Sequence, residues 1–398
     1  MEGMKIITKC LMILSLLFFF VFAESKESQK PEWKGKVETE KGVKVIKNPK
    51  EPLYGDIVFD LQEELTIGNE NDENSTFYQG LDIAVDKDEN IFVLDNGIFR
   101  VQKFDKDGRY LMTIGRKGQG PGEFQVLSSA FIDSKSSLYV NQGHSISVFD
   151  NQGKYNRSIP LGTHILFFGI TSDRNIIATT STIIPGKTSE DLILFDSMGK
   201  KLKTLATFPN VRVVPVGGIA LGARNRLAFY LSFCPLTEKI SLYGFSSEYK
   251  LYLIDSSGDV VSIIEKEEIP ERLTERDKEN TINAEIEFLK RRGMLIPKDE
   301  IKKAYPFPPH KSFFLGGFMT DDLGDIYVPK FSTIKKELYY DLFNPKGYYL
   351  YKVIMKEAVL PRTIKNGCIY ATSMDKETGC FKIKRYRIKN WDQIKVGI

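Results

Sequence analysis

The sequence predicts an all-β fold, a six-bladed β-propeller, and three observations support this prediction. A hairpin turn of the form Asp/Asn-x-x-Gly recurs between short apolar stretches. A second family of polar turns precedes each copy of the first. Gly108, Gly153 and Gly199 follow one another at intervals of about 45 residues, which is the length of one four-stranded blade.

The first turn family joins the third and fourth strands of each repeat, which we label C and D. An Asp or Asn side chain caps the turn, and glycine takes the positive-φ position that other residues resist. The capping residues of the five copies are Asp105, Asp150, Asp196, Asp255 and Asn344.

The second family joins strands A and B. Its copies are Asp86–Ile91, Asp133–Leu138, Ser172–Ile176, Gly222–Leu227, Asp321–Ile326 and Lys365–Ile369. The strands of blade one are then Leu81–Val85, Ile91–Leu94, Val101–Phe104 and Tyr110–Ile114. All four are rich in β-branched and aromatic residues, as strands are.

The sixth repeat lacks a strand D, because the chain ends without another C–D turn. An alternating stretch before blade one, Ile57–Leu61, can supply this strand. Pairing the two ends of the chain closes the ring and removes its exposed edges. We therefore expect a propeller closed by an N-terminal strand.

A long interval between blades four and five leaves seven blades as an alternative. We favour six, because Ile282, Ile286 and Leu289 recur at helical spacing among charged residues. Pro297 opens a second short helical stretch. The sequence thus predicts a helical insertion over about residues 270–314.

The amino terminus has the layout of a secretory signal peptide over residues 1–23. Lys5 and Lys9 precede an apolar run, Cys10–Phe22, and small residues stand before the expected cut after Ala23. A retained membrane anchor is the alternative, although the run is short for a span. We expect a monomeric periplasmic or secreted protein with an N-terminal extension over 24–53, a propeller over 54–398, and no membrane span after cleavage.

Composition limits the classes of partner that the protein is expected to bind. The net charge is +4 over 398 residues, and basic and acidic side chains are mixed, so nucleic-acid binding has no support. Cys234, Cys368 and Cys380 follow the signal segment and allow at most one disulfide, whose pairing stays open.

The connector Gly115–Phe124 (GRKGQGPGEF) resembles the inter-blade signature of NHL-repeat propellers. Ile83–Asp86 and Asn90–Asp95 are similar to the first half of that repeat. The likeness is strong in blade one, fair in blades two and five, and weak elsewhere. It extends to exported six-bladed propellers of bacterial envelopes. The resemblance implies the fold but no single function, because propellers serve as binding scaffolds, lyases and lactonases.

A functional site is expected on the face that carries the B–C loops and the connectors between blades, because the long segments gather there. These include Ile183–Glu190 and Pro235–Ser247. Residues at the strand ends and loops of this face are the predicted binding residues: Asn96, Arg100, Gln142, His144, His310, Lys311 and Lys330. Since several are cationic, we expect a small anionic or polar ligand, or an envelope protein.

The favoured function is non-catalytic binding, with no cofactor and no catalytic residue assigned. The alternative is a metal-dependent lyase or lactonase with its site at the channel mouth. Three histidines would suffice for an open zinc site, namely His144, His164 and His310. A calcium site could draw on Asp82, Asn96 and Asn141, although these form no acidic cluster.

Overall fold

The computed structural model describes residues 31–78, 82–184, 187–209, 214–216, 219–221, 227–305, 307–332, 337–355, 360–375 and 377–394. The chain forms two units, residues 1–33 and 34–398, and all that follows concerns the second. The predicted signal segment lies outside the described residues. Over the described ranges, no helix is both long enough and apolar enough to cross a membrane.

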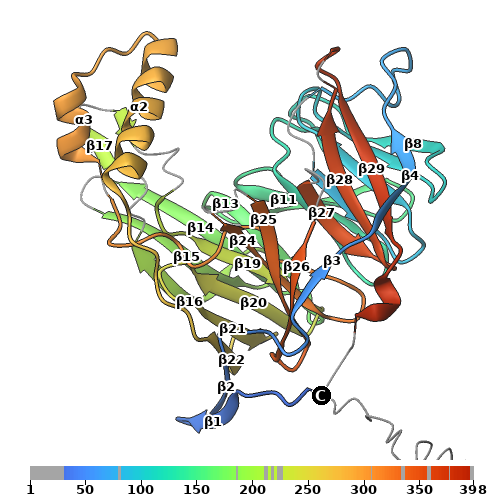
Figure 1. The fold of residues 1–398 in the computed structure, drawn as a ribbon. Helices are drawn as coiled ribbons and strands as arrows, with labels where there is room; N and C mark the ends of the chain where they lie inside the picture. The colour runs from blue at the N-terminus through green and yellow to red at the C-terminus, as the bar shows by residue number, and fades with distance from the viewer. Residues whose placement is uncertain are drawn as a thin grey trace, which may run out of the picture. The chain divides into compact units, whose positions relative to one another are not determined.

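The fold is an all-β six-bladed propeller, as predicted (Figure 1). Blade one consists of β5 (Asp82–Val85), β6 (Ile91–Asp95), β7 (Arg100–Phe104) and β8 (Tyr110–Ile114). Blade two consists of β9 (Ser129–Ile132), β10 (Leu138–Asn141), β11 (Ser145–Phe149) and β12 (Tyr155–Pro160). Blade three consists of β13 (Ile165–Ile170), β14 (Ile176–Ile184), β15 (Lys187–Phe195) and β16 (Lys201–Pro209).

The other half of the ring follows the same plan. Blade four consists of β19 (Leu231–Pro235), β20 (Ile240–Phe245), β21 (Lys250–Asp255) and β22 (Val260–Lys266). Blade five consists of β23 (Met319–Thr320), β24 (Ile326–Ser332), β25 (Glu337–Phe343) and β26 (Tyr349–Ile354). Blade six consists of β27 (Leu360–Lys365), β28 (Cys368–Met374), β29 (Phe381–Ile388) and β4 (Leu61–Ile67).

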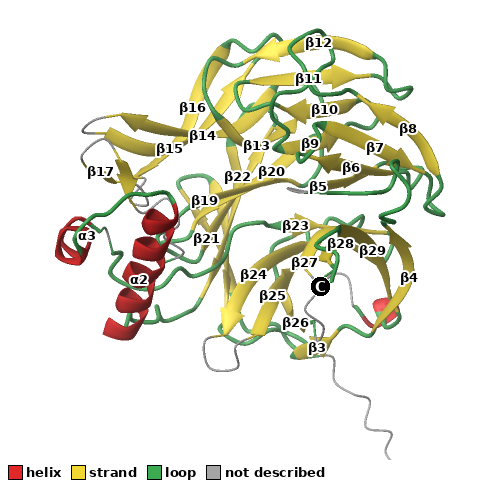
Figure 2. Ribbon diagram, turned by 90° about the horizontal axis from the view of Figure 1, so that it is seen from above, coloured by secondary structure: helices red, strands yellow, loops and turns green. Residues whose placement is uncertain are grey.

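The innermost strands of the blades surround the ring axis (Figure 2). Neighbouring inner strands contact one another, as β5 does with β9 and β27. A short hairpin, β17 (Val214–Val216) and β18 (Ile219–Leu221), lies between blades three and four in the chain. A 3₁₀ turn, Trp391–Gln393, follows β29.

The C–D turns form as the sequence predicts. Asp105 accepts hydrogen bonds from the backbone N–H groups of Asp107 and Arg109 at 2.9 and 2.8 Å. Asp150, Asp196, Asp255 and Asn344 repeat this pattern. The turn of blade three also requires glycine for space, because a Cβ on Gly199 would lie 2.1 Å from the Pro160 carbonyl oxygen.

Ring closure by an N-terminal strand is confirmed, but the residues differ from those expected. The strand that completes blade six is β4, which pairs antiparallel with β29 from Leu61 opposite Ile388 to Ile67 opposite Ile383. Part of the predicted strand, Ile57–Leu61, lies in β3 (Asp56–Val58), which pairs parallel with β26 of blade five. Apolar and polar residues alternate in both stretches, so this pattern alone could not show which of them pairs with β29.

The segment before β3 also joins the ring. β1 (Lys36–Glu40) and β2 (Val43–Asn48) form a hairpin, and β2 pairs parallel with β22 of blade four. Residues 36–67, which we call the N-terminal strap, therefore extend or complete blades four, five and six in turn. Within the expected N-terminal extension over 24–53, residues 36–40 and 43–48 are thus part of the blade four sheet.

The strand assignment in blade four needs correction. The sequence placed its A–B turn at Gly222–Leu227 and a long loop at Pro235–Ser247. In the structure Leu231–Pro235 is strand A, and the tight turn after it leads into β20 within the supposed loop. Strands A and B are similarly apolar in this blade. The sequence pattern therefore did not distinguish them, and the segment before Pro235 was interpreted as strand B instead of strand A. Residues 222–226 lie outside the described residues.

The hydrophobic cores lie between neighbouring blades. Where blade six meets blade one, Ile67 and Ile383 pack with Phe77, Ile83 and Phe104. Each fully buried side chain of this size contributes about 1.5–3 kcal/mol. Closure of the ring is therefore held by packing as well as by strand pairing.

The predicted helical insertion between blades four and five is present. It contains α2 (Glu275–Arg291) and α3 (Lys298–Ala304). Thr274 and Asp277 form a reciprocal capping box that starts α2. Ile282 and Leu289 of α2 form a small separate core with Ile301 of α3 and Tyr305.

Candidate functional site

The antiparallel order of each blade places its turns on two faces. The A–B and C–D turns lie at one end of the strands, and the B–C loops and inter-blade connectors lie at the other. We call the second the loop face. The helical insertion and the long β14–β15 hairpin both leave the ring from this face.

The side chains of Asn96 and Arg100 in blade one form hydrogen bonds with the backbone of neighbouring segments. The Asn96 side chain accepts a hydrogen bond from the Leu127 N–H at 3.1 Å, which ties blade one to the connector before blade two. The Arg100 guanidinium donates to the Thr76 carbonyl oxygen at 2.9 Å. These two contacts position the loops of the face.

Lys330 is buried, with 5% of its surface exposed, and is part of an ionic network between blades four and five. It pairs with Glu268, which also binds Lys266 at 3.0 Å. Lys266 in turn binds Asp341 at 2.8 Å. Asp341 is fully buried and accepts hydrogen bonds from the hydroxyls of Tyr249 and Tyr349, both at 2.6 Å.

Electrostatics inside this network favour a closed structural unit. Burial alone would raise the pKa of Asp341, but Lys266 and Lys330 outweigh it and hold the pKa below its usual range. Burial lowers the pKa of Lys330. Because each charge is met by its neighbours, the network joins blades four and five at the base of the insertion.

Gln142, Lys311 and His310 also contact nearby protein groups. The Gln142 amide donates to the Ser147 hydroxyl at 2.6 Å. Lys311 pairs with Glu271 at 2.6 Å and lies 3.4 Å from Asp277. His310 packs against Phe229, with ring centres 4.9 Å apart.

The three histidines do not all converge. His144 and His164 are exposed and in contact, with ring centres 5.4 Å apart. His310 belongs to the insertion, where it packs against Phe229 and Phe313. The described ranges contain no group of three or more His, Cys, Asp or Glu side chains arranged to hold a metal ion.

At the channel mouth, Asp82 begins the innermost strand of blade one. Burial raises the pKa of its carboxyl, and the nearby Arg362 guanidinium opposes the rise. Asn141, named with Asp82 as a possible calcium ligand, is fully buried and donates to the Ser129 hydroxyl and to the Ile165 carbonyl oxygen, both at 3.3 Å. It therefore fastens the blade two loops.

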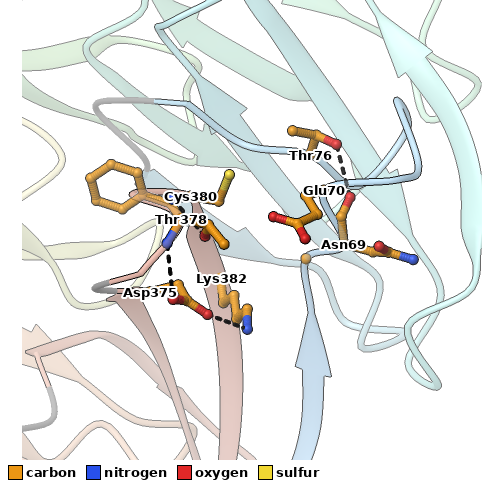
Figure 3. A pocket seen from close by; sticks show the side chains of 9 residues that line it. Asn69, Glu70, Thr76, Asp375, Thr378, Cys380 and Lys382 are labelled. Atoms are coloured by element: carbon orange, nitrogen blue, oxygen red, sulfur yellow. Dashed lines mark hydrogen bonds and ion pairs between the residues drawn. The ribbon is translucent and has the colours of Figure 1, made fainter.

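A polar hollow of about 160 Å³ lies on the loop face where blade six meets blade one (Figure 3). Two segments line it: the connector that follows β4, and the B–C loop of blade six with the start of β29. Its lining residues are Gly68, Asn69, Glu70, Thr76, Asp375, Thr378, Cys380, Phe381 and Lys382. Ring closure brings these segments together, and the backbone bridge between Phe77 and Phe381 holds them in register.

The charged side chains that line the hollow differ in the hydrogen bonds and ion pairs that they form. Asp375 accepts from Lys382 at 2.9 Å and from the backbone N–H groups of Glu377 and Thr378. The Lys382 ammonium, followed by these two N–H groups, lowers the pKa of Asp375 to about 2. Glu70 is exposed and accepts no hydrogen bond from the described residues, so the hollow carries an open carboxylate and a net negative charge.

A wider groove of about 440 Å³ lies between blades two and three. Its carboxylate, Asp191, already accepts from the hydroxyls of Ser189 and Thr207 at 3.1 and 2.7 Å. A third hollow of about 250 Å³ on the insertion is lined mainly by apolar side chains such as Ile286 and Leu295. Among the described residues that line these three hollows, the carboxylate without a hydrogen-bond partner is Glu70, in the hollow over blade six.

Comparison with known proteins agrees with the fold. A family model described as a domain of unknown function, DUF4934, matches residues 70–234, from the connector before blade one to the first strand of blade four. No curated protein gives a significant match.

Similar solved structures include a Bacteroides fragilis protein described as exported. It is 14% identical, the alignment covers 87% of this chain and 99% of that chain, and the TM-score is 0.50. A DUF4221 family member from Bacteroides vulgatus is 11% identical over 83% of this chain and 98% of that chain, with a TM-score of 0.49. A gluconolactonase from Xanthomonas campestris is 10% identical over 82% and 99%, with a TM-score of 0.42. At these identities the likeness concerns the fold alone.

Sequence reasoning missed Glu70, Asp375 and Lys382. They match no motif, and Glu70 is about 300 residues from the other two. The one available signal was ring closure itself, because it predicts that the connector before blade one meets the loops of blade six. Assigning the closing strand to Ile57–Leu61 concealed that signal.

Proposed function

We propose that the protein is an exported, non-catalytic binding propeller that holds an amine-bearing polar group in the hollow over blades six and one. The observation that carries this proposal is the open Glu70 carboxylate, which lies in a polar hollow on the loop face beside the compensated Asp375–Lys382 pair. An ammonium or guanidinium group is the charge that such a carboxylate attracts.

The size of the hollow sets the kind of ligand. At about 160 Å³ it is smaller than the usual site for a drug-sized molecule, so it suits a small amine or one basic side chain of an envelope protein. The cations of the predicted site support this choice, because Lys311 and Lys330 are paired with carboxylates. Export is supported by the predicted signal segment and by the exported protein of similar fold.

The proposal is tested with free lysine as the probe, titrated into isotopically labelled protein and followed by NMR. We expect shifts confined to the connector after β4 and the loop before β29. Glu70→Gln should weaken lysine binding about tenfold, since it removes the charge but keeps the shape. Glu73→Gln is the matched control, because Glu73 is exposed on the same connector but does not line the hollow. Equal weakening in both variants, or no shifts in this region, would overturn the proposal.

The alternative, a metal-dependent lyase or lactonase, makes a different prediction. Purified protein would hydrolyse gluconolactone in a metal-dependent manner, and Glu70→Gln would leave the rate unchanged. That result would replace the binding function with catalysis.

A further inference from the structure

We propose that His144 and His164 form a two-histidine binding site for a divalent transition-metal ion such as Zn²⁺ or Cu²⁺ on the loop face between blades two and three. The site is separate from the hollow over blade six and does not include His310. It therefore differs from the three-histidine arrangement considered from the sequence.

The distance between the rings fits shared coordination. Their centres are 5.4 Å apart, and the ring planes make an angle of 74°. Two imidazoles that bind one tetrahedral ion through nitrogens at about 2.0 Å place their ring centres about 5 Å apart. The edge of His164 that carries Nε2 faces the turn bearing His144, since a Cβ on Gly143 would lie 3.8 Å from that nitrogen.

Backbone contacts hold the two loops together on both sides of the pair. The Leu161 N–H donates to the His144 carbonyl oxygen at 3.0 Å. The Ile165 N–H donates to the Gly143 carbonyl oxygen at 2.6 Å. The histidines are therefore presented by a fixed frame, which reduces the entropy lost on metal binding.

The buried Asn141 side chain strengthens this frame from below. Its oxygen accepts from the Gly143 N–H at 2.8 Å, and its amide donates to the Ile165 carbonyl oxygen at 3.3 Å. One residue thus connects the turn of His144 to the strand that follows His164.

Both imidazoles are open to a ligand. They are exposed, and neither ring nitrogen has a hydrogen-bond partner among the described residues. Imidazole favours Zn²⁺ and Cu²⁺ over Mg²⁺ or Ca²⁺, and Cu²⁺ should bind more tightly than Zn²⁺. Two protein ligands leave positions on the ion for water or for a donor group on a partner molecule.

The test is isothermal titration of ZnCl₂ into protein without a polyhistidine tag. We expect one ion per chain, and at least tenfold weaker binding for His144→Ala and for His164→Ala. Binding should also weaken as the pH falls, because protons compete with the metal ion for imidazole nitrogens. Cu²⁺-loaded protein should show coupling to two nitrogens in its electron paramagnetic resonance spectrum.

His310→Ala is the matched control, since the chain has three histidines. It should bind zinc as the wild type does, and so should Glu70→Gln, which separates this site from the proposed ligand hollow. Unchanged binding in both His144→Ala and His164→Ala, or an equal loss in His310→Ala, would overturn the proposal. Circular dichroism of each variant without metal excludes misfolding as the cause of a loss.

Discussion

Blades one to three and blades four to six share one four-stranded plan, but they are completed differently. The four strands of each of the first three blades come from one continuous stretch of chain. The sheets of the last three blades also contain strands from the N-terminal strap: β1 and β2 in blade four, β3 in blade five and β4 in blade six. Short-range pairing therefore builds the four strands of each of blades one to five, and the N-terminal strap extends blades four and five and completes blade six.

The largest effect is expected from deletion of Leu61–Ile67, which forms β4. This deletion tests whether the N-terminal strap completes blade six. Blade six would lose its outer strand, and Ile67 would leave the core between blades six and one. The exposed edge of β29 should then pair with other chains, so we expect loss of the folded monomer, measured by size-exclusion chromatography and thermal unfolding.

Deletion of Lys36–Glu40 is the control for that experiment. These residues form β1, the outermost strand of the blade four sheet, and most of them are exposed. This shorter deletion should leave a monomer with a nearly unchanged melting temperature. If both deletions behaved alike, the strap would not close the ring in the way described.

A smaller effect is expected where the strap joins blades four and five. The buried Asn48 of β2 donates to the carbonyl oxygens of Gly347 and Glu265 at 2.9 and 3.1 Å and accepts from the Tyr349 N–H at 2.8 Å. Asn48→Ala leaves these backbone groups without their partners, so we expect a loss of about 2–4 kcal/mol in urea unfolding.

Asn151→Ala tests whether that loss is specific to the strap. Asn151 is exposed in the C–D turn of blade two, a self-contained blade. Its replacement should change the free energy of unfolding by less than about 0.5 kcal/mol. Comparable losses at both positions would contradict the special role of the strap.

The smallest effect is expected at the A–B turn, in the position directly before strand B. This position is Asn90 in blade one and Asp325 in blade five. In blade one the Asn90 amide donates to Asp86 at 2.8 Å. In blade five Asp325 occupies this position, and both of its carboxyl oxygens are buried without a hydrogen-bond partner among the described residues. Burial, and secondly the charge of Asp321, raise the pKa of Asp325 to about 7.

A raised folded-state pKa makes stability depend on pH in a defined direction. The contribution of protonated Asp325 is fully present below the unfolded pKa, near 4, and is lost as the pH rises through about 7. Asp325→Asn should therefore stabilise the protein by about 2 kcal/mol at pH 8, with the gain shrinking toward pH 4. Asn90→Asp should lose stability at pH 8. Equal effects at both pH values would show that the ionisation of Asp325 is not the cause.

What the sequence determined by itself was local. The C–D turns, the strands beside most of them and the capping box of α2 depend on residues within about five positions of one another, so their interactions can be read from neighbouring letters. The number of blades followed from the copies of these turns together with the helical spacing of Ile282, Ile286 and Leu289, and the need for an N-terminal closing strand followed from the missing strand D of blade six.

The tertiary structure alone decided the contacts between distant segments. The pairing of β4 with β29, the ion pair of Lys330 with Glu268 and the approach of Glu70 to Lys382 all depend on how the blades assemble into the ring. The sequence around a charged residue at a strand end does not show whether its side chain is buried or exposed. Its partners come from other blades, and the register between blades is set by packing of their buried side chains rather than by local pattern.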